Sequence, residues 1–93
     1  QEGSTYAAYR LGKEYLTGEH APKSGENAVR CFRSSAEQGS PFAQYMLGKL
    51  YLDGEALPRD QEQAVQWFRR SAAQGNRYAQ FFLDRQNDLR RPG

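Results

Sequence analysis

Histidine and cysteine, which often act as catalytic groups or zinc ligands, are scarce in this protein. His20 is the single histidine and Cys31 the single cysteine among 93 residues. Metal sites and nucleophilic catalysis need several such groups at defined spacings, and the sequence holds no glycine-rich phosphate loop, paired-carboxylate set or Ser/His/Asp set. We therefore interpret His20 as a loop residue and Cys31 as a small residue on an apolar helix face. The sequence predicts no enzyme, no metal site and no cofactor.

Aromatic and basic side chains, by contrast, recur at a constant interval of 36 positions. Aromatic rings supply large contact areas to a partner, and lysine or arginine supplies electrostatic steering and register. The chemistry that this pattern indicates is binding. The recurring sets are Tyr6/Phe42/Tyr78, Tyr9/Tyr45/Phe81, Lys13/Lys49/Arg85 and Leu16/Leu52/Asp88.

The same interval relates two whole segments of the chain. Residues 9–44 align with residues 45–80 without a gap, and 20 of the 36 positions are identical. A repeat of this length is one supersecondary unit that cannot bury its apolar face alone, so neighbouring units complete the core. We expect a single helical-repeat domain over residues 1–93. Its parts are a first repeat at about 5–40, a second at about 41–75 and a capping half-repeat at about 76–91.

Five helices account for the apolar periodicity, and we predict them at about 5–16, 25–37, 41–52, 61–73 and 77–90. Side-chain oxygens that can cap a following helix stand at four boundaries: Ser24, Ser40, Asp60 and Asn76. Asp60 with Gln63 resembles a capping box. Glycines that can close a helix in the left-handed conformation follow four last turns: Gly18, Gly39, Gly54 and Gly75.

Gly12 and Gly48 lie inside predicted helices, where glycine costs about 1 kcal/mol relative to alanine. We expect the partner helix of the same hairpin to approach closely at both positions. Asp84 occupies the equivalent position in the last helix, as expected for a terminal helix that caps the array. Truncation of the sequence within a repeat is the alternative explanation.

The third predicted helix carries two stripes at helical spacing. We expect the first stripe to pack on the fourth helix; it consists of Ala43, Leu47, Leu50 and Tyr51. A helix with one solvent-exposed face would not need the second stripe, which consists of Phe42, Tyr45, Lys49 and Leu52.

The sequence resembles the Sel-one-like repeat family, whose members are related to tetratricopeptide repeats. The resemblance covers about residues 6–90 and rests on small, aromatic and turn residues at fixed offsets: Ala43-Gln44-Tyr45-Met46-Leu47-Gly48, Tyr51-Leu52, Gly54, Pro58, Asp60, Ala64-Val65, Trp67-Phe68, Ser71-Ala72, Gly75 and Ala79. The first repeat has Cys31 in the position of Trp67. The resemblance implies an all-α fold, an α/α solenoid of antiparallel helix pairs in a right-handed superhelix. It also implies adaptor or scaffold work by protein binding.

Two features depart from the family pattern. The loops at 18–22 and 54–58 lack the second glycine often found there, and Cys31 alone cannot form the paired-cysteine staple of cysteine-rich members. The second repeat is also similar to repeats at the ends of large mobilisation relaxases of gut bacteria. That similarity would make the chain an accessory module of a DNA-processing protein.

In tetratricopeptide-type arrays, the positions of the second stripe line the concave groove. The resemblance therefore implies a partner-binding groove formed by Tyr9, Lys13, Phe42, Tyr45, Lys49, Leu52, Tyr78, Phe81 and Arg85. An aromatic floor with a basic row suits an extended or helical peptide with apolar side chains and some acid. The alternative is that adjacent first helices touch, so that Phe42 and Tyr45 belong to the core between repeats.

The formal net charge of +2 is too small for polyanion binding by charge alone. Rings beside Lys13, Lys49 and Arg85 would suit single-stranded nucleic acid, which stays an alternative. No apolar run is long enough for a membrane span and no signal peptide is present, and with one cysteine this favours the cytoplasm. We expect a fragment of a larger bacterial protein with an unidentified protein or peptide partner.

Overall fold

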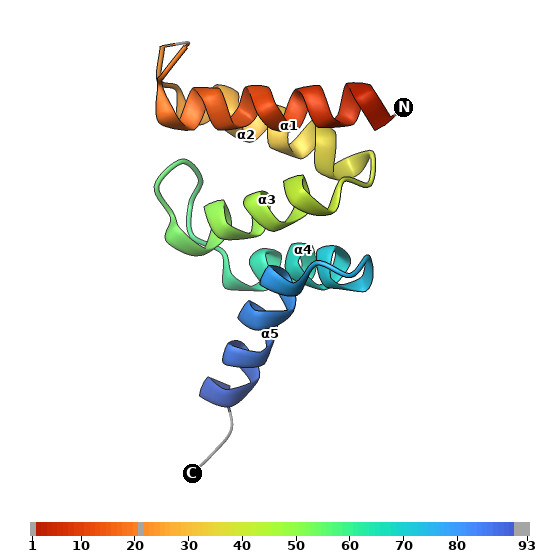
Figure 1. Cartoon of the computed structure of the whole chain (residues 1–93). Helices are drawn as coiled ribbons and strands as arrows, with labels where there is room; N and C mark the ends of the chain where they lie inside the picture. The colour runs from red at the N-terminus through yellow and green to blue at the C-terminus, as the bar shows by residue number, and fades with distance from the viewer. Residues whose placement is uncertain (1, 21, 91–93) are drawn as a thin grey trace.

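The computed structural model describes residues 2–20 and 22–90, with the side chains of residues 5–20 and 22–85. The described residues contain these helices: α1 (Glu2–Thr17), α2 (Gly25–Glu37), α3 (Pro41–Asp53), α4 (Gln61–Ala73) and α5 (Arg77–Arg90). The helices α1 and α2, and α3 and α4, form antiparallel pairs, with α1, α3 and α5 in front of α2 and α4 (Figure 1). The predicted all-α stack of helix pairs is confirmed. Compared with the predicted bounds, α1 is longer at both ends and α3 continues through Asp53.

Polar side chains cap the beginnings of α2, α3 and α4, as the sequence predicts. The Ser24 hydroxyl accepts from the Asn27 N–H at 3.2 Å, and the Ser40 hydroxyl accepts from the Ala43 N–H at 3.2 Å. Asp60 accepts from the Gln63 N–H at 3.1 Å, which is one half of the predicted capping box. The Asp60 N–H donates to the Tyr51 carbonyl at 3.0 Å, and not to the Gln63 side chain as a full capping box would require. This bond anchors the loop to the end of α3.

The two helix pairs reuse one set of tertiary hydrogen bonds. The Ser35 hydroxyl donates to the Thr5 carbonyl at 2.7 Å, and its counterpart Ser71 donates to the Pro41 carbonyl at 2.6 Å. Each serine is fully buried at the end of a second helix and reaches the beginning of its first helix. Because buried hydroxyls need a partner, these bonds fix how the two helices of a pair lie against each other.

Close approach of paired helices explains both helical glycines. A Cβ at Gly48 would lie 2.9 Å from Cε1 of Phe68 on α4, and one at Gly12 would lie 2.9 Å from Cε1 of Phe32 on α2. Both phenylalanines are fully buried. The prediction that partner helices approach at these glycines is confirmed. Asp84, the equivalent residue on α5, is exposed.

The core forms between helix pairs as well as within them. Leu47 and Leu50 of α3 join one buried cluster with Phe32 of α2 and Trp67 of α4. The prediction that the Ala43/Leu47/Leu50/Tyr51 face packs on the fourth helix is therefore only partly right, because α2 supplies most of its buried partners. Contact with α4 uses the neighbouring side of α3 at Gly48. The helix α3 thus packs on α2 of the pair before it and on its own partner α4.

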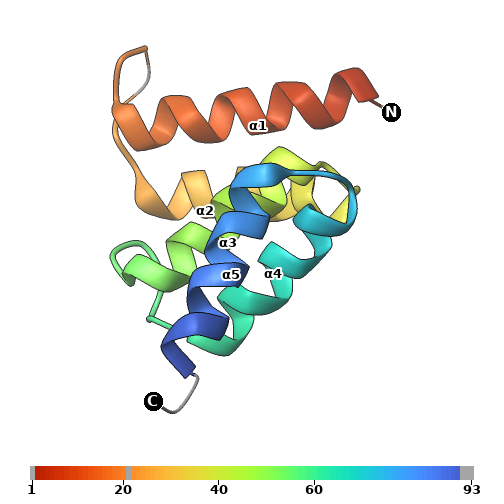
Figure 2. The same ribbon diagram turned by 60° about the horizontal axis from the view of Figure 1, so that its bottom comes forward.

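The last helix, α5, packs against α4 of the second helix pair. Ala79 of α5 is buried with Ala64 and Phe68 of α4, and Phe82 and Leu83 pack against them. Figure 2 shows α5 crossing in front of α3 and α4. Among the described residues, no helix combines the length and apolar character needed to cross a bilayer.

Candidate functional site

A row of exposed aromatic rings runs across the beginnings of the first helices. Tyr6 of α1 and Phe42 of α3 are each 55% exposed, and Tyr78 of α5 is 70% exposed. Phe81, one turn further along α5, is 56% exposed. Large apolar side chains at this level of exposure contribute little to the core. The first column of the sequence pattern is therefore more than half exposed, although Phe42 also contacts the Tyr9 ring of the neighbouring first helix.

The second column is divided between surface and core. Tyr9 and Tyr45 are half-buried, whereas Phe81 is exposed. The Tyr45 ring lies 5.9 Å, centroid to centroid, from each of Phe68, Tyr78 and Phe82. Burial raises the pKa of the Tyr45 phenol above its ordinary value, and the neighbouring tyrosines add to that effect. Tyr45 therefore has a structural role that Phe42 lacks.

Rings of adjacent repeats touch in a pattern that itself repeats. Tyr9 lies 5.8 Å from Phe42, and Tyr45 lies 5.9 Å from Tyr78. Tilted ring pairs at this separation are favourable. The exposed ring of one repeat thus rests on the half-buried ring of the previous repeat at both junctions between repeats.

Each repeat places a cation on its second-column ring. Lys13 Nζ lies 5.5 Å from the Tyr9 centroid and Lys49 Nζ 5.4 Å from that of Tyr45. The Arg85 guanidinium lies 5.6 Å from the Phe81 ring. All three cations are exposed, and none forms an ion pair with a carboxylate among the described side chains. We call this surface the aromatic–basic strip: Tyr6, Tyr9, Lys13, Phe42, Tyr45, Lys49, Tyr78, Phe81 and Arg85.

Leu52, also predicted for the site, lines a cleft with Phe81 and Arg85 of the strip. It is half-buried and packs against the cluster of Ala64, Phe68 and Ala79. Leu16, its equivalent on α1, packs against the other core cluster. Asp88, the third member of that column, has a side chain outside the described part of the chain.

Shallow clefts between adjacent first helices repeat with the sequence. At the start of the first helices, one cleft lies between Tyr6 and Phe42 and its counterpart between Phe42 and Tyr78. The glycine turn of each repeat also lines its cleft, and a Cβ at Gly39 or Gly75 would meet nothing within 4 Å. These ring clefts are open to solvent and chiefly uncharged.

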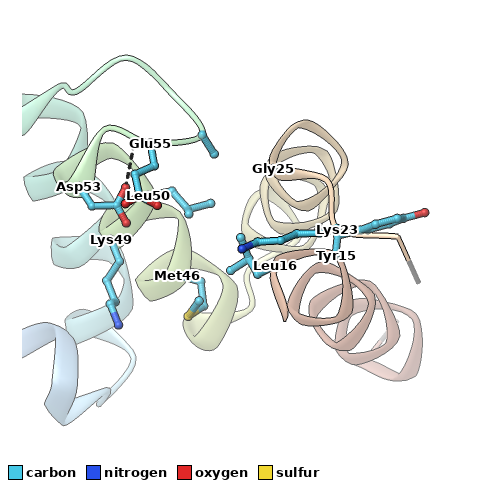
Figure 3. Close-up of a pocket in the computed structure, with 10 residues that line it drawn as sticks. Tyr15, Leu16, Lys23, Gly25, Met46, Lys49, Leu50, Asp53 and Glu55 are labelled. Atoms are coloured by element: carbon cyan, nitrogen blue, oxygen red, sulfur yellow. Dashed lines mark hydrogen bonds between the residues drawn. The ribbon is translucent and has the colours of Figure 1, made fainter. Parts of the chain in front are cut away.

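At the other end of the first helices, a second kind of cleft also occurs twice. Lys23 and Lys49 line one, and their counterparts Arg59 and Arg85 line the other. The first of these also contains Asp53 and Glu55, from which Lys49 extends away in Figure 3. Sequence reasoning missed Lys23 and Arg59 as site residues. The repeat alignment held the signal, because the two loop cations are also 36 positions apart.

His20 is less isolated than the sequence suggests. Its Nδ1 lies 2.8 Å from Glu14 Oε1, and ligand atoms of Glu14, Glu19 and His20 lie within 4.8 Å of one another. The hydrogen bond that the His20 ring donates to the Glu14 carboxylate raises the pKa of His20, and the negative charge of Glu14 adds to that effect. His20 and Glu19 are exposed, and the His20–Glu14 contact accounts for the arrangement as a surface ion pair.

Cys31 is partly buried, and burial raises the pKa of its thiol. A raised pKa disfavours the reactive thiolate. Its counterpart Trp67 is buried in the core between helix pairs. Cys31 therefore occupies a packing position and has no features of a nucleophile.

Comparison with known proteins agrees with this geometry. The Sel1 repeat model matches residues 5–40 and 41–76. A Sel1 repeat protein from Oxalobacter formigenes is 34% identical with a TM-score of 0.84, over 89% of this chain and 63% of that one. A protective antigen of uropathogenic Escherichia coli, c5321, which displays an SLR fold, is 38% identical with a TM-score of 0.81, over 85% of this chain and 17% of that one.

This chain thus spans less than two thirds of the length of both solved relatives. No curated protein matches it. Two matched repeats cover most of the sequence, and the glycine contacts, the capping bonds and the serine bonds between paired helices recur with the same period. The chain belongs to the Sel1 repeat family.

Proposed function

We propose that the aromatic–basic strip binds a peptide segment of a partner protein, and that the chain acts as a non-enzymatic interaction module within a larger protein. Sel1 repeats are helical-repeat scaffolds that generally mediate protein interactions. The observation that carries the proposal is the exposure of Tyr6, Phe42 and Tyr78 at equivalent positions on three successive first helices. Exposed aromatic side chains beside an arginine or lysine are the residues on which binding energy concentrates.

The arrangement favours an extended ligand over a compact one. The ring clefts and the cation positions recur from one helix pair to the next, so the strip offers the same contacts repeatedly. An extended segment presents successive side chains along such a surface, and its main chain lies on the rings between them. Rigid aromatic anchors bind with a small loss of side-chain entropy.

Affinity capture with ring-deletion variants tests the proposal. The variant Phe42→Ala/Tyr78→Ala removes two exposed rings, and we expect it to lose a partner that the wild type retains from a lysate of the source cell. Removal of two anchor rings costs about 2 kcal/mol or more of binding free energy, which is about thirtyfold in Kd. Leu11→Ala is the matched control, because Leu11 is a 45% exposed apolar residue outside the strip. Equal retention by the ring variant would contradict the proposal.

Single-stranded nucleic acid is a second candidate ligand, favoured by the cations that lie over Tyr9, Tyr45 and Phe81. It would fit an accessory module of a DNA-mobilisation protein. The acidic groups Asp53 and Glu55 beside Lys49 oppose it. Fluorescence polarisation of labelled oligo(dT) at low and high salt separates the candidates, because nucleic-acid binding falls steeply with salt.

A further inference from the structure

The cleft between Leu52 of α3, α4 and α5 combines two arginines with apolar walls. It has a volume of about 360 Å³, and its charged lining consists of Arg59 and Arg85. Leu52, Phe81 and Phe82 supply much of the apolar wall. No carboxylate from the described side chains lines it. The cleft therefore concentrates two positive charges beside an apolar surface. We call it the arginine cleft.

Both guanidinium groups of the arginine cleft keep donors for a ligand. Arg59 Nε donates to the Leu52 carbonyl at 3.1 Å, which fixes the side chain at the rim through one of its five N–H groups. Arg85 lies over the Phe81 ring, and neither arginine forms an ion pair with a described carboxylate. A guanidinium held on a ring or by one backbone bond loses less side-chain entropy when an anion binds.

The equivalent cleft one repeat earlier is different in charge. There Lys23 and Lys49 face a wall that includes Asp53 and Glu55, so two cations and two carboxylates line the same hollow. Figure 3 shows Lys49 directed away from both acids. Of these two repeat-related clefts, the arginine cleft therefore has the greater formal positive charge from the described side chains.

We infer that the arginine cleft binds a glutamate or aspartate of the partner segment, with an apolar side chain of the same segment against Leu52 and Phe82. This inference rests on the proposed function and names the chemistry of the partner. Charge complementarity carries it, because two arginines line the cleft and a guanidinium fork matches a carboxylate geometrically. The cleft holds one acidic side chain, and Lys49 and Lys13 extend the basic row for further acids along an extended segment.

An acidic peptide fits this surface better than a nucleic acid. Single-strand binding uses a groove of positive charge that follows many phosphates. Here the strongly basic cleft is local, and its repeat-related neighbour is neutralised by Asp53 and Glu55. A polyphosphate backbone would meet these carboxylates, whereas a peptide can place its acids only where the arginines stand.

Selection from a random peptide library displayed on phage tests the inference. We expect segments selected on the wild-type protein to be enriched in Asp and Glu over Lys and Arg. Arg59→Glu/Arg85→Glu should abolish or invert that enrichment. Arg30→Glu/Arg69→Glu is the matched control, because it changes the net charge equally at exposed positions outside the clefts. It should leave the enrichment unchanged.

The affinity of one selected acidic peptide then gives the magnitude. We expect Arg85→Glu alone to weaken binding about tenfold or more, since an attraction becomes a repulsion. This single variant leaves the Arg59–Leu52 bond intact, and circular dichroism verifies its helical content. A matched peptide with Gln for each Glu should bind the wild type about as weakly as the acidic peptide binds the variant.

The outcomes separate the inference from the proposed function. The selected segments could lack net acidity and still fail to bind Phe42→Ala/Tyr78→Ala. That result would overturn the inference of an acidic partner segment and would leave the aromatic–basic strip as a peptide site. If no segment is enriched on the wild-type protein above its level on the ring variant, both the inference and the proposed function are overturned. Oligo(dT) bound more tightly than any selected peptide, and lost with Arg85→Glu, would overturn the inference in favour of nucleic acid.

Discussion

Gly48→Ala tests whether α3 and α4 touch as closely as the structure places them. In a helix without a neighbour, this change would stabilise the fold by about 1 kcal/mol, because alanine is the better helix former. Here the new methyl would lie 2.9, 3.0 and 3.1 Å from Cε1, Cδ1 and Cζ of Phe68. Ordinary carbon–carbon contacts are about 3.5–4.0 Å, so the ring or the helix has to move by about 0.5 Å or more.

The Phe68 ring has little room to move. It is 1% exposed, stacks on Phe82 with centroids 5.0 Å apart and contacts Tyr45. Overpacking of such a site costs about 1–3 kcal/mol. Subtracting the gain in helix propensity leaves a net destabilisation of about 0–2 kcal/mol, and the constrained ring favours the upper half of that range.

Urea denaturation followed by circular dichroism measures the change. In thermal denaturation, a loss of 1 kcal/mol would appear as a Tm lower by about 4–8 °C for a domain of this size. Asp84→Ala is the matched control, because Asp84 occupies the same repeat position on α5 with an exposed side chain. We expect it to be neutral or slightly stabilising. Stabilisation of about 1 kcal/mol by Gly48→Ala would refute the close approach of the two helices.

Three further predictions concern the strip, a cap and the loop. Tyr45→Ala should destabilise the fold by about 2 kcal/mol and Phe42→Ala by less than about 1 kcal/mol. The reason is that Tyr45 packs among three rings, whereas Phe42 is 55% exposed. Equal losses of stability in urea denaturation would contradict this difference. Asp60→Ala should cost about 1 kcal/mol through loss of the cap on α4, and Asp60→Asn should restore most of it in the same assay.

The third concerns His20, whose pKa in an NMR titration should lie above 6.5 and fall back in Glu14→Gln. Because the pKa is higher in the folded protein, any stability that it contributes is present below pH 6.5 and disappears as the pH rises through the folded value. An unchanged pKa in Glu14→Gln would contradict the ion pair.

The helices and their caps could be predicted from the sequence because local chemistry determines them. Ser24 and Ser40 accept the expected N–H groups, and Gly54 closes α3 in the left-handed conformation. The predicted capping box at Asp60 is only half formed, because the Asp60 N–H donates to the Tyr51 carbonyl and not to the Gln63 side chain. That competing acceptor comes from another helix, which helical spacing within one segment does not reveal.

The candidate site was predictable as a set of residues but not as a division between surface and core. The period of 36 identified the columns of rings and cations. It could not distinguish Phe42, 55% exposed, from Tyr45, which packs among rings of α4 and α5. Nor could it show that Leu52 has two sides, one that packs on the core cluster of α4 and α5 and one that lines the arginine cleft. Exposure depends on how far each helix rotates against its neighbours, and that angle follows from contacts between helices.

Chemical-shift mapping tests the central claim most directly. Uniformly labelled protein is titrated with one selected peptide, and amide and aromatic ring shifts are followed by NMR. We predict that the largest changes occur at Tyr6, Phe42, Tyr78, Phe81 and Arg85, on the exposed side of α1, α3 and α5. Changes confined to α2 and α4, with the strip unaffected, would show that the partner binds the opposite side and would contradict the proposed binding surface.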